Sequence, residues 1–159
     1  MPSALDLRMD AAVAAITATD GALPLVTTPS RFGIDLPAIR VAPPSLGAFF
    51  AHFCAQHGDA PFLVDADQRL SFAETHQRAT LAARALIWHF ALVRGDRVAT
   101  AARNGSAWII LYMAVLMAGG VGTLLNGWWQ GEELADGIDD TGATLVFAAP
   151  PSARRVAGT

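Results

Sequence analysis

A long stretch without charged residues, residues 104–131, limits the possible folds of this chain more than any other feature. Its central part, residues 107–125, is almost entirely apolar. A stretch of this length and hydropathy either crosses a membrane as a helix or lies buried inside a folded domain. The sequence must therefore contain a membrane span here or a core large enough to cover this segment.

Three glycines interrupt the apolar run where the helix of a folded domain would end, at Gly119, Gly120 and Gly122. We therefore expect a buried helix over residues 108–117, followed by a core strand over residues 121–125. Glycine is also tolerated in membrane helices, so this pattern alone does not decide the question. A single-pass protein remains the alternative.

Strand-like and helix-like segments alternate on both sides of this run. The expected strands are residues 60–65, 69–71, 97–102, 121–125 and 144–148, and the expected helices are residues 46–57, 72–90, 108–117 and 131–140. Such alternation is typical of α/β domains with parallel strand pairs. We predict an α/β fold whose helices pack on a mixed, largely parallel sheet.

The helix over residues 72–90 has the clearest signals. Ser71 and Glu74 form a capping-box pattern, in which each side chain satisfies a free backbone amide of the first turn. Apolar positions then recur at steps of three and four residues, which predicts one buried helix face. The members of that face are Phe72, His76, Ala79, Ala83, Leu86 and Phe90.

Composition divides the chain into three parts. Residues 1–44 contain repeated prolines and an Ala-rich segment at residues 10–19, and we expect an irregular, proline-rich arm. Residues 45–150 carry the regular pattern and form the predicted α/β subdomain. Residues 151–159 begin at the second proline of the pair Pro150-Pro151, and we expect a disordered tail.

Bulk composition excludes several classes of function. The chain is 53% hydrophobic and 16% charged with a net charge of −3, so neither overall disorder nor nucleic-acid binding is expected. The single cysteine, Cys54, cannot form an internal disulfide, which suits a reducing compartment. The first residues do not resemble a secretory signal.

Short motifs follow one another in a recognisable order. They are residues 70–74 (LSFAE), 94–98 (RGDRV), 104 (N), 116–121 (LMAGGV), 125–126 (LN), 131–134 (GEEL), 140–143 (DTGA) and 145–147 (LVF). Together they resemble the amino-terminal region of the adenylate-forming superfamily, which includes acyl-CoA synthetases. The run 126–134 (NGWWQGEEL) is most similar to fatty-acyl-CoA synthetases. The departures, such as Phe72 for the usual tyrosine and Ala101-Ala102-Arg103 for a pattern ending in proline, concern packing positions.

This resemblance implies a partial N-terminal subdomain of an AMP-forming acyl-CoA synthetase. The complete enzyme would use ATP, Mg²⁺ and coenzyme A to convert a fatty or other carboxylic acid into acyl-CoA, AMP and pyrophosphate. In the family, a Ser/Thr/Gly-rich loop and a catalytic lysine act on ATP, and both lie after the matched region. The printed sequence contains no lysine. We therefore assign no catalytic, cofactor-binding or metal-binding residue, and expect the chain alone to be inactive.

The Trp128-Trp129 pair is the one candidate for substrate binding. The favoured interpretation is an apolar anchor of the loop. The functional alternative, which the position in the resembled family permits, is that one ring helps to line the acyl channel or a lipid-facing entrance. Other local patterns favour structural roles. His76 is expected to be a packed histidine, and residues 120–122 (GVG) follow a helix and open a strand, the reverse of a dinucleotide motif.

The expected partner is the remainder of a longer synthetase chain or a complementing subunit, because the matched region alone would leave apolar surface exposed. A non-catalytic interaction or remnant protein is a further alternative. We expect a cytoplasmic location, with peripheral membrane association through the lipid substrate as an option, and neither nucleic acid nor an integral membrane span.

Overall fold

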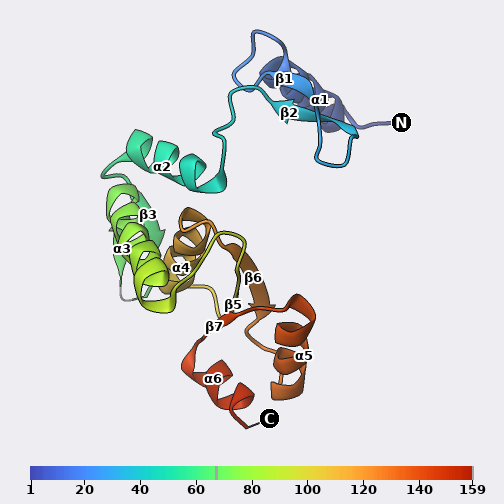
Figure 1. Ribbon diagram of the computed structural model, residues 1–159. Coiled ribbons are helices and arrows are strands. Elements are labelled where there is room, and N and C mark those ends of the chain that lie inside the picture. The colour runs from blue at the N-terminus through green and yellow to red at the C-terminus, as the bar shows by residue number, and fades with distance from the viewer. Residues whose placement is uncertain (67, 159) are drawn as a thin grey trace. The chain divides into compact units, whose positions relative to one another are not determined.

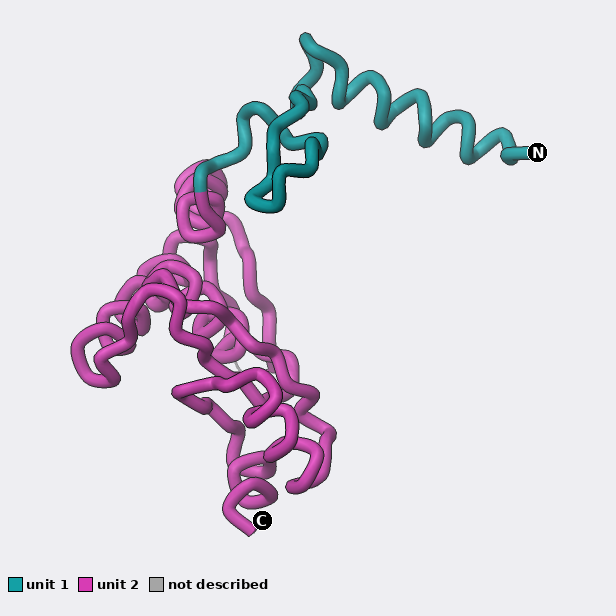
Figure 2. The backbone as a smooth tube through the Cα atoms, turned by 45° about the vertical axis from the view of Figure 1, so that its right-hand side comes forward, with its two compact units in different colours: residues 1–44 teal, residues 45–159 magenta. Residues whose placement is uncertain are grey.

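The computed structural model of the protein describes residues 1–66 and 68–158. The chain divides into two compact units, Met1–Pro44 and Ser45–Thr159, coloured teal and magenta in Figure 2.

The first unit contains one helix and one hairpin. Its elements are α1 (Ala4–Thr17), β1 (Leu25–Pro29) and β2 (Asp35–Ile39), with the two strands antiparallel. The prolines of residues 1–44 predicted an irregular arm instead. A two-stranded sheet consists of edge strands, where the missing N–H of proline is tolerated, so Pro29 and Pro37 fit into the hairpin. Pro24 is the only buried residue among residues 1–44, all of which are described.

The second unit contains the α/β pattern. Its elements are α2 (Leu46–His57), β3 (Pro61–Val64), β4 (Arg69–Ser71), α3 (Phe72–Phe90), β5 (Arg97–Ala102), α4 (Ser106–Met117), β6 (Val121–Asn126), α5 (Gly131–Thr141), β7 (Leu145–Ala148) and α6 (Pro150–Val156). Strands β6, β5 and β7 form a parallel sheet in that order, and β3 pairs antiparallel with β4 (Figure 1). The predicted α/β class with a largely parallel sheet is confirmed.

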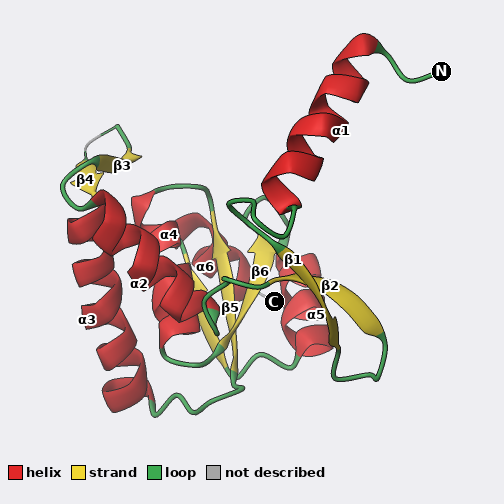
Figure 3. Cartoon of the chain, turned by 90° about the horizontal axis from the view of Figure 1, so that it is seen from above, coloured by secondary structure: helices red, strands yellow, loops and turns green. Residues whose placement is uncertain are grey.

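The central strand β5 separates two apolar cores because successive side chains point to opposite faces of the sheet. Val98 packs with buried residues of α3 and α4, whereas Ala99 and Ala101 pack with Leu125 and Leu134 on the side of α5. Figure 3 shows these helices on both sides of β5. A third cluster joins α2, α3 and α4 through Cys54, Ala79 and Met113.

Helix α3 begins as the capping pattern predicts. Ser71 Oγ accepts a hydrogen bond from Glu74 N at 3.1 Å, and Glu74 Oε2 accepts one from Ser71 N at 2.9 Å. Its buried face consists of Thr75, Ala79, Ala83 and Leu86. The buried face of α3 is therefore rotated slightly about the helix axis from the predicted face. The reason is that α3 packs mainly on α4.

The apolar run forms a helix and a strand. Helix α4 has 12 residues, and its rise of 1.5 Å per residue gives about 18 Å, well short of the ~30 Å core of a bilayer. The chain then turns, and β6 enters the parallel sheet at Val121. Across the described residues, no helix has both the length and the hydropathy to cross a membrane. Residues 107–125 therefore form parts of a helix and a strand, and not the one continuous helix that the single-span alternative requires.

The expected disordered tail, residues 151–159, is wrong for residues 151–156, which belong to α6. Pro150 and Pro151 end β7, but proline also suits the first turn of a helix, where its missing N–H costs no hydrogen bond. Side chains of α6 then bind the loop after β6, as described below. The last residue of the predicted tail, Thr159, lies outside the described residues.

Candidate functional site

The carboxyl ends of β5, β6 and β7 lie at one edge of the sheet because the strands are parallel. In open α/β sheets, ligands bind outside this edge, where the following loops provide the contacts. Here the loops begin at Arg103, Gly127 and Ala149. This edge is the candidate functional site.

Gly127 brings the loop after β6 directly against the end of β5. A Cβ atom at this position would lie 2.8 Å from both the backbone carbon and oxygen of Ala102, closer than real Cβ atoms approach. The Gly127 carbonyl accepts hydrogen bonds from Arg155 Nη2 at 2.6 Å and Ser152 Oγ at 3.5 Å. Helix α6 thus holds the loop that carries the tryptophan pair.

Trp128 lies at the surface of this edge. It is 65% exposed, and the Arg103 guanidinium carbon lies 3.7 Å from the centre of its ring, a cation–π geometry. The Trp128 backbone N–H donates to Asn126 Oδ1 at 3.0 Å, which fixes the turn after β6. Arg103 and Trp128 therefore combine a positive charge with a flat apolar surface.

Trp129 points the other way, into the core beside α5. Its side chain packs with Leu125 and Leu134, and a Cβ at Gly137 would meet the Trp129 ring at 2.9 Å. Trp129 is thus an anchor of α5 on the sheet. The two candidates from sequence analysis have different environments, and only Trp128 lines the candidate site.

Trp108 of α4 lines three hollows near this edge. The one of about 600 Å³ extends to β3 and includes Asp65, and the other two lie at the strand ends. One, of about 420 Å³, lies between the ends of β5 and β6, and the other, of about 300 Å³, lies between β5, α4 and β7. The first includes Arg103 and Trp128, and the second is mainly apolar, with Leu111 and Phe147 in its wall. Neither lining includes an acidic residue.

Asp65 fixes the start of α4 beside these hollows. Its Oδ2 accepts a hydrogen bond from Ser106 N at 3.1 Å, and its Oδ1 accepts one from Ala66 N at 2.8 Å. The Ser106 bond first, and then the Ala66 bond, hold the pKa of Asp65 below its ordinary value. Asp65 thus caps a helix whose first residue, Ser106, lies 41 positions later in the sequence, and this role was not predicted.

The remaining sequence candidates lie elsewhere. His76 is half-buried, and its Nε2 atom is buried without a partner among the described residues. The segment 120–122 follows α4 and opens β6, the order that argued against a dinucleotide motif. Within the described chain, no group of three or more His, Cys, Asp or Glu side chains is arranged to hold a metal ion.

Sequence analysis missed Arg103 and Asn126 as site residues. Their signal was available in principle, because each lies at or directly after the last residue of a predicted parallel strand. The strand was predicted to end at residue 125, whereas β6 ends at Asn126, so the prediction placed Asn126 in the following loop.

The family model described as "AMP-binding enzyme" matches residues 50–158, more than half of the chain. The chain belongs to the AMP-binding enzyme family. The resemblance to the N-terminal region of adenylate-forming enzymes is thereby confirmed. The match begins within α2 and includes the whole carboxyl edge of the sheet.

The names of two curated relatives state that these proteins act on or transport long-chain fatty acids. The long-chain-fatty-acid–CoA ligase of Salmonella typhimurium is 27% identical over 121 residues, covering 74% of this chain. Long-chain fatty acid transport protein 2 of Rattus norvegicus is 32% identical over 90 residues, covering 57% of this chain. The chain spans 21% and 14% of the lengths of these two proteins.

Solved structures agree on the fold. A fatty acyl-CoA synthetase of Mycobacterium tuberculosis matches with a TM-score of 0.68 and 22% identity, over 72% of this chain and 23% of that one. The N-terminal subdomain of NpsA from Klebsiella oxytoca matches with a TM-score of 0.61 and 17% identity, over 65% of this chain and 27% of that one. The chain has the α/β fold of N-terminal domains of adenylate-forming enzymes.

Proposed function

We propose that the chain forms the N-terminal α/β subdomain of an ATP-dependent acyl-CoA synthetase for a fatty or other carboxylic acid. The observation that carries this proposal is the carboxyl edge of the parallel sheet, where Arg103 and Trp128 line one hollow and Trp108 joins it to a second, mainly apolar hollow. Family membership supplies the reaction class, and the Salmonella typhimurium relative supplies the acid class.

In this proposal, the Trp108 and Trp128 rings form part of the wall for the acyl chain, and Arg103 supplies a positive charge at its open end. ATP, Mg²⁺ and coenzyme A serve the complete enzyme. No side chain of this sequence is assigned to them, because the resembled family uses a lysine for the phosphate chemistry and the sequence has none. The chain contributes a wall and a packing surface to a site completed elsewhere.

A binding measurement tests the acyl wall. Trp128→Ala is expected to weaken binding of a long-chain fatty acid to the chain in fluorescence titration, since the ring provides apolar contact area. Trp88→Ala is the matched control, because Trp88 is 80% exposed and lies on α3 away from the hollow. Equal weakening by both variants would remove Trp128 from the proposed wall.

An ATP–pyrophosphate exchange assay tests the assignment of the chemistry. The chain as printed is expected to give no exchange with any carboxylic acid, and measurable turnover would overturn this part of the proposal.

The nucleotide sequence downstream of the codon for Thr159 provides a second test. We expect it to encode a Ser/Thr/Gly-rich loop that ends in lysine.

We propose further that the rest of a synthetase, or a complementing subunit, covers the apolar surface of this unit. Strand β6 is an edge strand, and its Val121 and Leu124 are each about half exposed, at 48% and 49%. The isolated chain is therefore expected to self-associate in analytical ultracentrifugation. A stable monomer with cooperative unfolding would contradict this proposal.

We propose a cytoplasmic location for the protein, and peripheral membrane contact through its lipid substrate as the alternative. Carbonate extraction is expected to release all of the chain from membranes. Retention in the carbonate pellet would instead support the integral-span alternative.

A further inference from the structure

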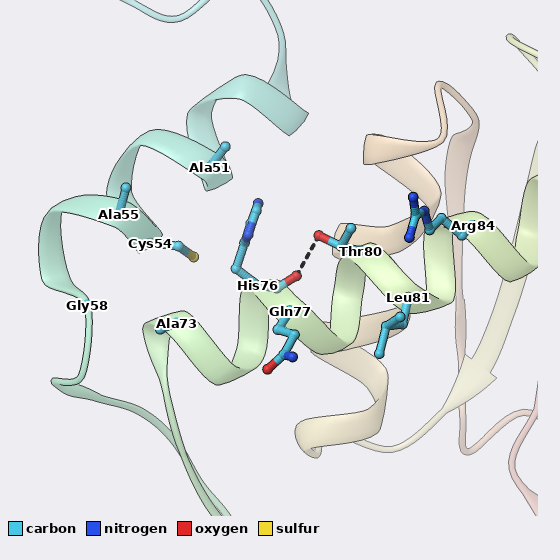
Figure 4. A pocket seen from close by; sticks show the side chains of 10 residues that line it. All are labelled: Ala51, Cys54, Ala55, Gly58, Ala73, His76, Gln77, Thr80, Leu81 and Arg84. Carbon is cyan, nitrogen blue, oxygen red and sulfur yellow. Dashed lines mark hydrogen bonds between the residues drawn. The ribbon is translucent and has the colours of Figure 1, made fainter.

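The second half of α3 exposes a helix face that is rich in large apolar side chains. Leu81, Ile87 and Trp88 are 59%, 43% and 80% exposed. Arg84 lies three positions from Leu81 and Ile87 and four from Trp88, so the four side chains occupy one side of the helix. Figure 4 shows Leu81 and Arg84 projecting from α3. We call the surface of these four residues the outer face of α3.

Helix α2 packs on the first half of α3 and not on the outer face. Cys54 of α2 clusters with Ala79, and the ring centroids of His57 and Phe72 lie 4.7 Å apart. On the opposite side of α3, Leu86 packs in the core with residues of α4. Figures 1 and 3 show the C-terminal end of α3 extending past α2 at the outside of unit 2. The outer face is therefore a protruding apolar helix surface, of the kind that marks an interaction site.

The charge around the outer face is positive, although the net charge of the chain is −3. Residues 75–95 contain three arginines, two histidines and no acidic residue. Arg84 and Arg94 are exposed, and neither has a carboxylate partner among the described residues. The nearby Asp96 carboxylate accepts a hydrogen bond from Val93 N at 2.9 Å and so belongs to the turn after α3. Charge complementarity therefore requires an anionic partner.

We propose that the outer face of α3 docks reversibly on an anionic lipid surface. Tryptophan is favoured at the boundary between headgroups and acyl chains, which suits the exposed ring of Trp88. Leu81 and Ile87 enter the same layer, and the Arg84 guanidinium pairs with lipid phosphate. A bilayer accommodates a protruding helix without a preformed complementary surface, whereas a protein partner needs one.

This docking surface is distinct from the candidate site at the sheet edge. Helix α3 leads into β5, so its C-terminal end lies toward the amino ends of the parallel strands, opposite the carboxyl edge. Docking uses neither the acid substrate nor ATP, so loss of vesicle binding and loss of fatty acid binding are separate results. A single fatty acid molecule offers no continuous charged surface, and Trp88 therefore remains a control residue for the acyl wall.

Co-sedimentation of the full chain with lipid vesicles measures the docking. Vesicles of equimolar phosphatidylcholine and phosphatidylglycerol are expected to bind the chain, and vesicles of phosphatidylcholine alone are expected to bind much less. Added salt is expected to weaken the binding, because it screens the arginine charges. Equal binding to both kinds of vesicle, or binding to neither, would overturn the proposal.

Two substitutions locate the docking surface. Trp88→Ala is expected to lower the vesicle partition coefficient about tenfold through lost apolar contact, and Arg84→Gln about fivefold through lost charge. Phe32→Ala and Arg31→Gln are the matched controls, since Phe32 is 75% exposed and Arg31 forms a cation–π pair with its ring in unit 1. Controls that weaken binding as much as the α3 variants would contradict the docking surface.

Contact between copies of the chain is the competing use of the outer face. The expected result for Trp88→Ala and Arg84→Gln is weaker vesicle binding with unchanged sedimentation in analytical ultracentrifugation. If both variants instead dispersed oligomers and left vesicle binding unchanged, the outer face would be a protein contact and the lipid proposal would be wrong. Both side chains are exposed, so the variants are expected to keep the urea midpoint of the parent.

Discussion

Gly127 is the residue on which the geometry of the sheet edge most depends. Gly127→Ala would place a methyl group against the rigid backbone of Ala102, and relieving the overlap is expected to cost about 1–3 kcal/mol of unfolding free energy. Urea denaturation measures the loss. Gly158→Ala is the control, since its added Cβ would meet the nearest atom at an ordinary 3.6 Å. Similar stability of the two variants would show that the loop shifts without cost.

Asp65 gives the site a defined pH dependence. Its pKa is lowered in the folded chain, so the stabilisation by its carboxylate is complete above the ordinary value of 3.8 and is lost as the pH falls through the folded value. Asp65→Ala is therefore expected to lower the urea midpoint at neutral pH and to match the parent at strongly acidic pH. Asp136→Ala, at an exposed position of α5, is the control. A difference from the parent that persists in acid would contradict this role.

The two tryptophans show the limit of residue-level prediction at this site. Sequence places Trp128 and Trp129 side by side in an uncharged loop, and nothing local distinguishes them. Their separation depends on long-range contacts, Arg103 for one ring and Leu134 for the other. Such contacts follow from the assembled sheet, so the exposed member of the pair was not predictable.

Helix α6 is held in place by hydrogen bonds of Arg155 and by apolar contacts of Val156 with the core beside α5. Arg155 Nη2 donates to the Gly127 carbonyl and to Ser152 Oγ, at 2.6 and 2.9 Å. A hydrogen bond from a charged group contributes about 1.5–3 kcal/mol, so Arg155→Ala is expected to speed amide exchange in α6 by tenfold or more. Hydrogen–deuterium exchange measures this effect. Arg154→Ala changes the neighbouring exposed arginine, and a comparable acceleration in that variant would exclude the specific contact.

Elements with local signals were predicted well, and elements that depend on distant contacts were not. The capping box at Ser71 and Glu74 predicted the start of α3, and Gly119-Gly120 correctly separated α4 from β6. The hairpin β1–β2 and helix α6 were missed, because prolines were read as breaks in structure. Proline excludes a helix interior or a central strand, but it permits an edge strand or a first helical turn.

At the scale of the molecule, burial is concentrated in the family-matched part. All three apolar clusters consist of residues from Phe50 onward, close to where the match begins. In contrast, unit 1 exposes large apolar side chains such as Phe32, at 75%. The free energy of folding is therefore expected to arise almost wholly in unit 2, since buried apolar area is its main source.

Removal of residues 1–44 tests this distribution. The shortened chain, residues 45–159, is expected to keep the urea midpoint of the parent, because it retains every residue of the three clusters. Leu134→Ala in the full chain is the contrasting variant, because Leu134 is fully buried and its truncation is expected to cost about 2–5 kcal/mol. If the deletion lowered the midpoint as much as Leu134→Ala, unit 1 would have to contribute to the core. If the deletion were neutral, the α/β unit would carry both the fold and the candidate site.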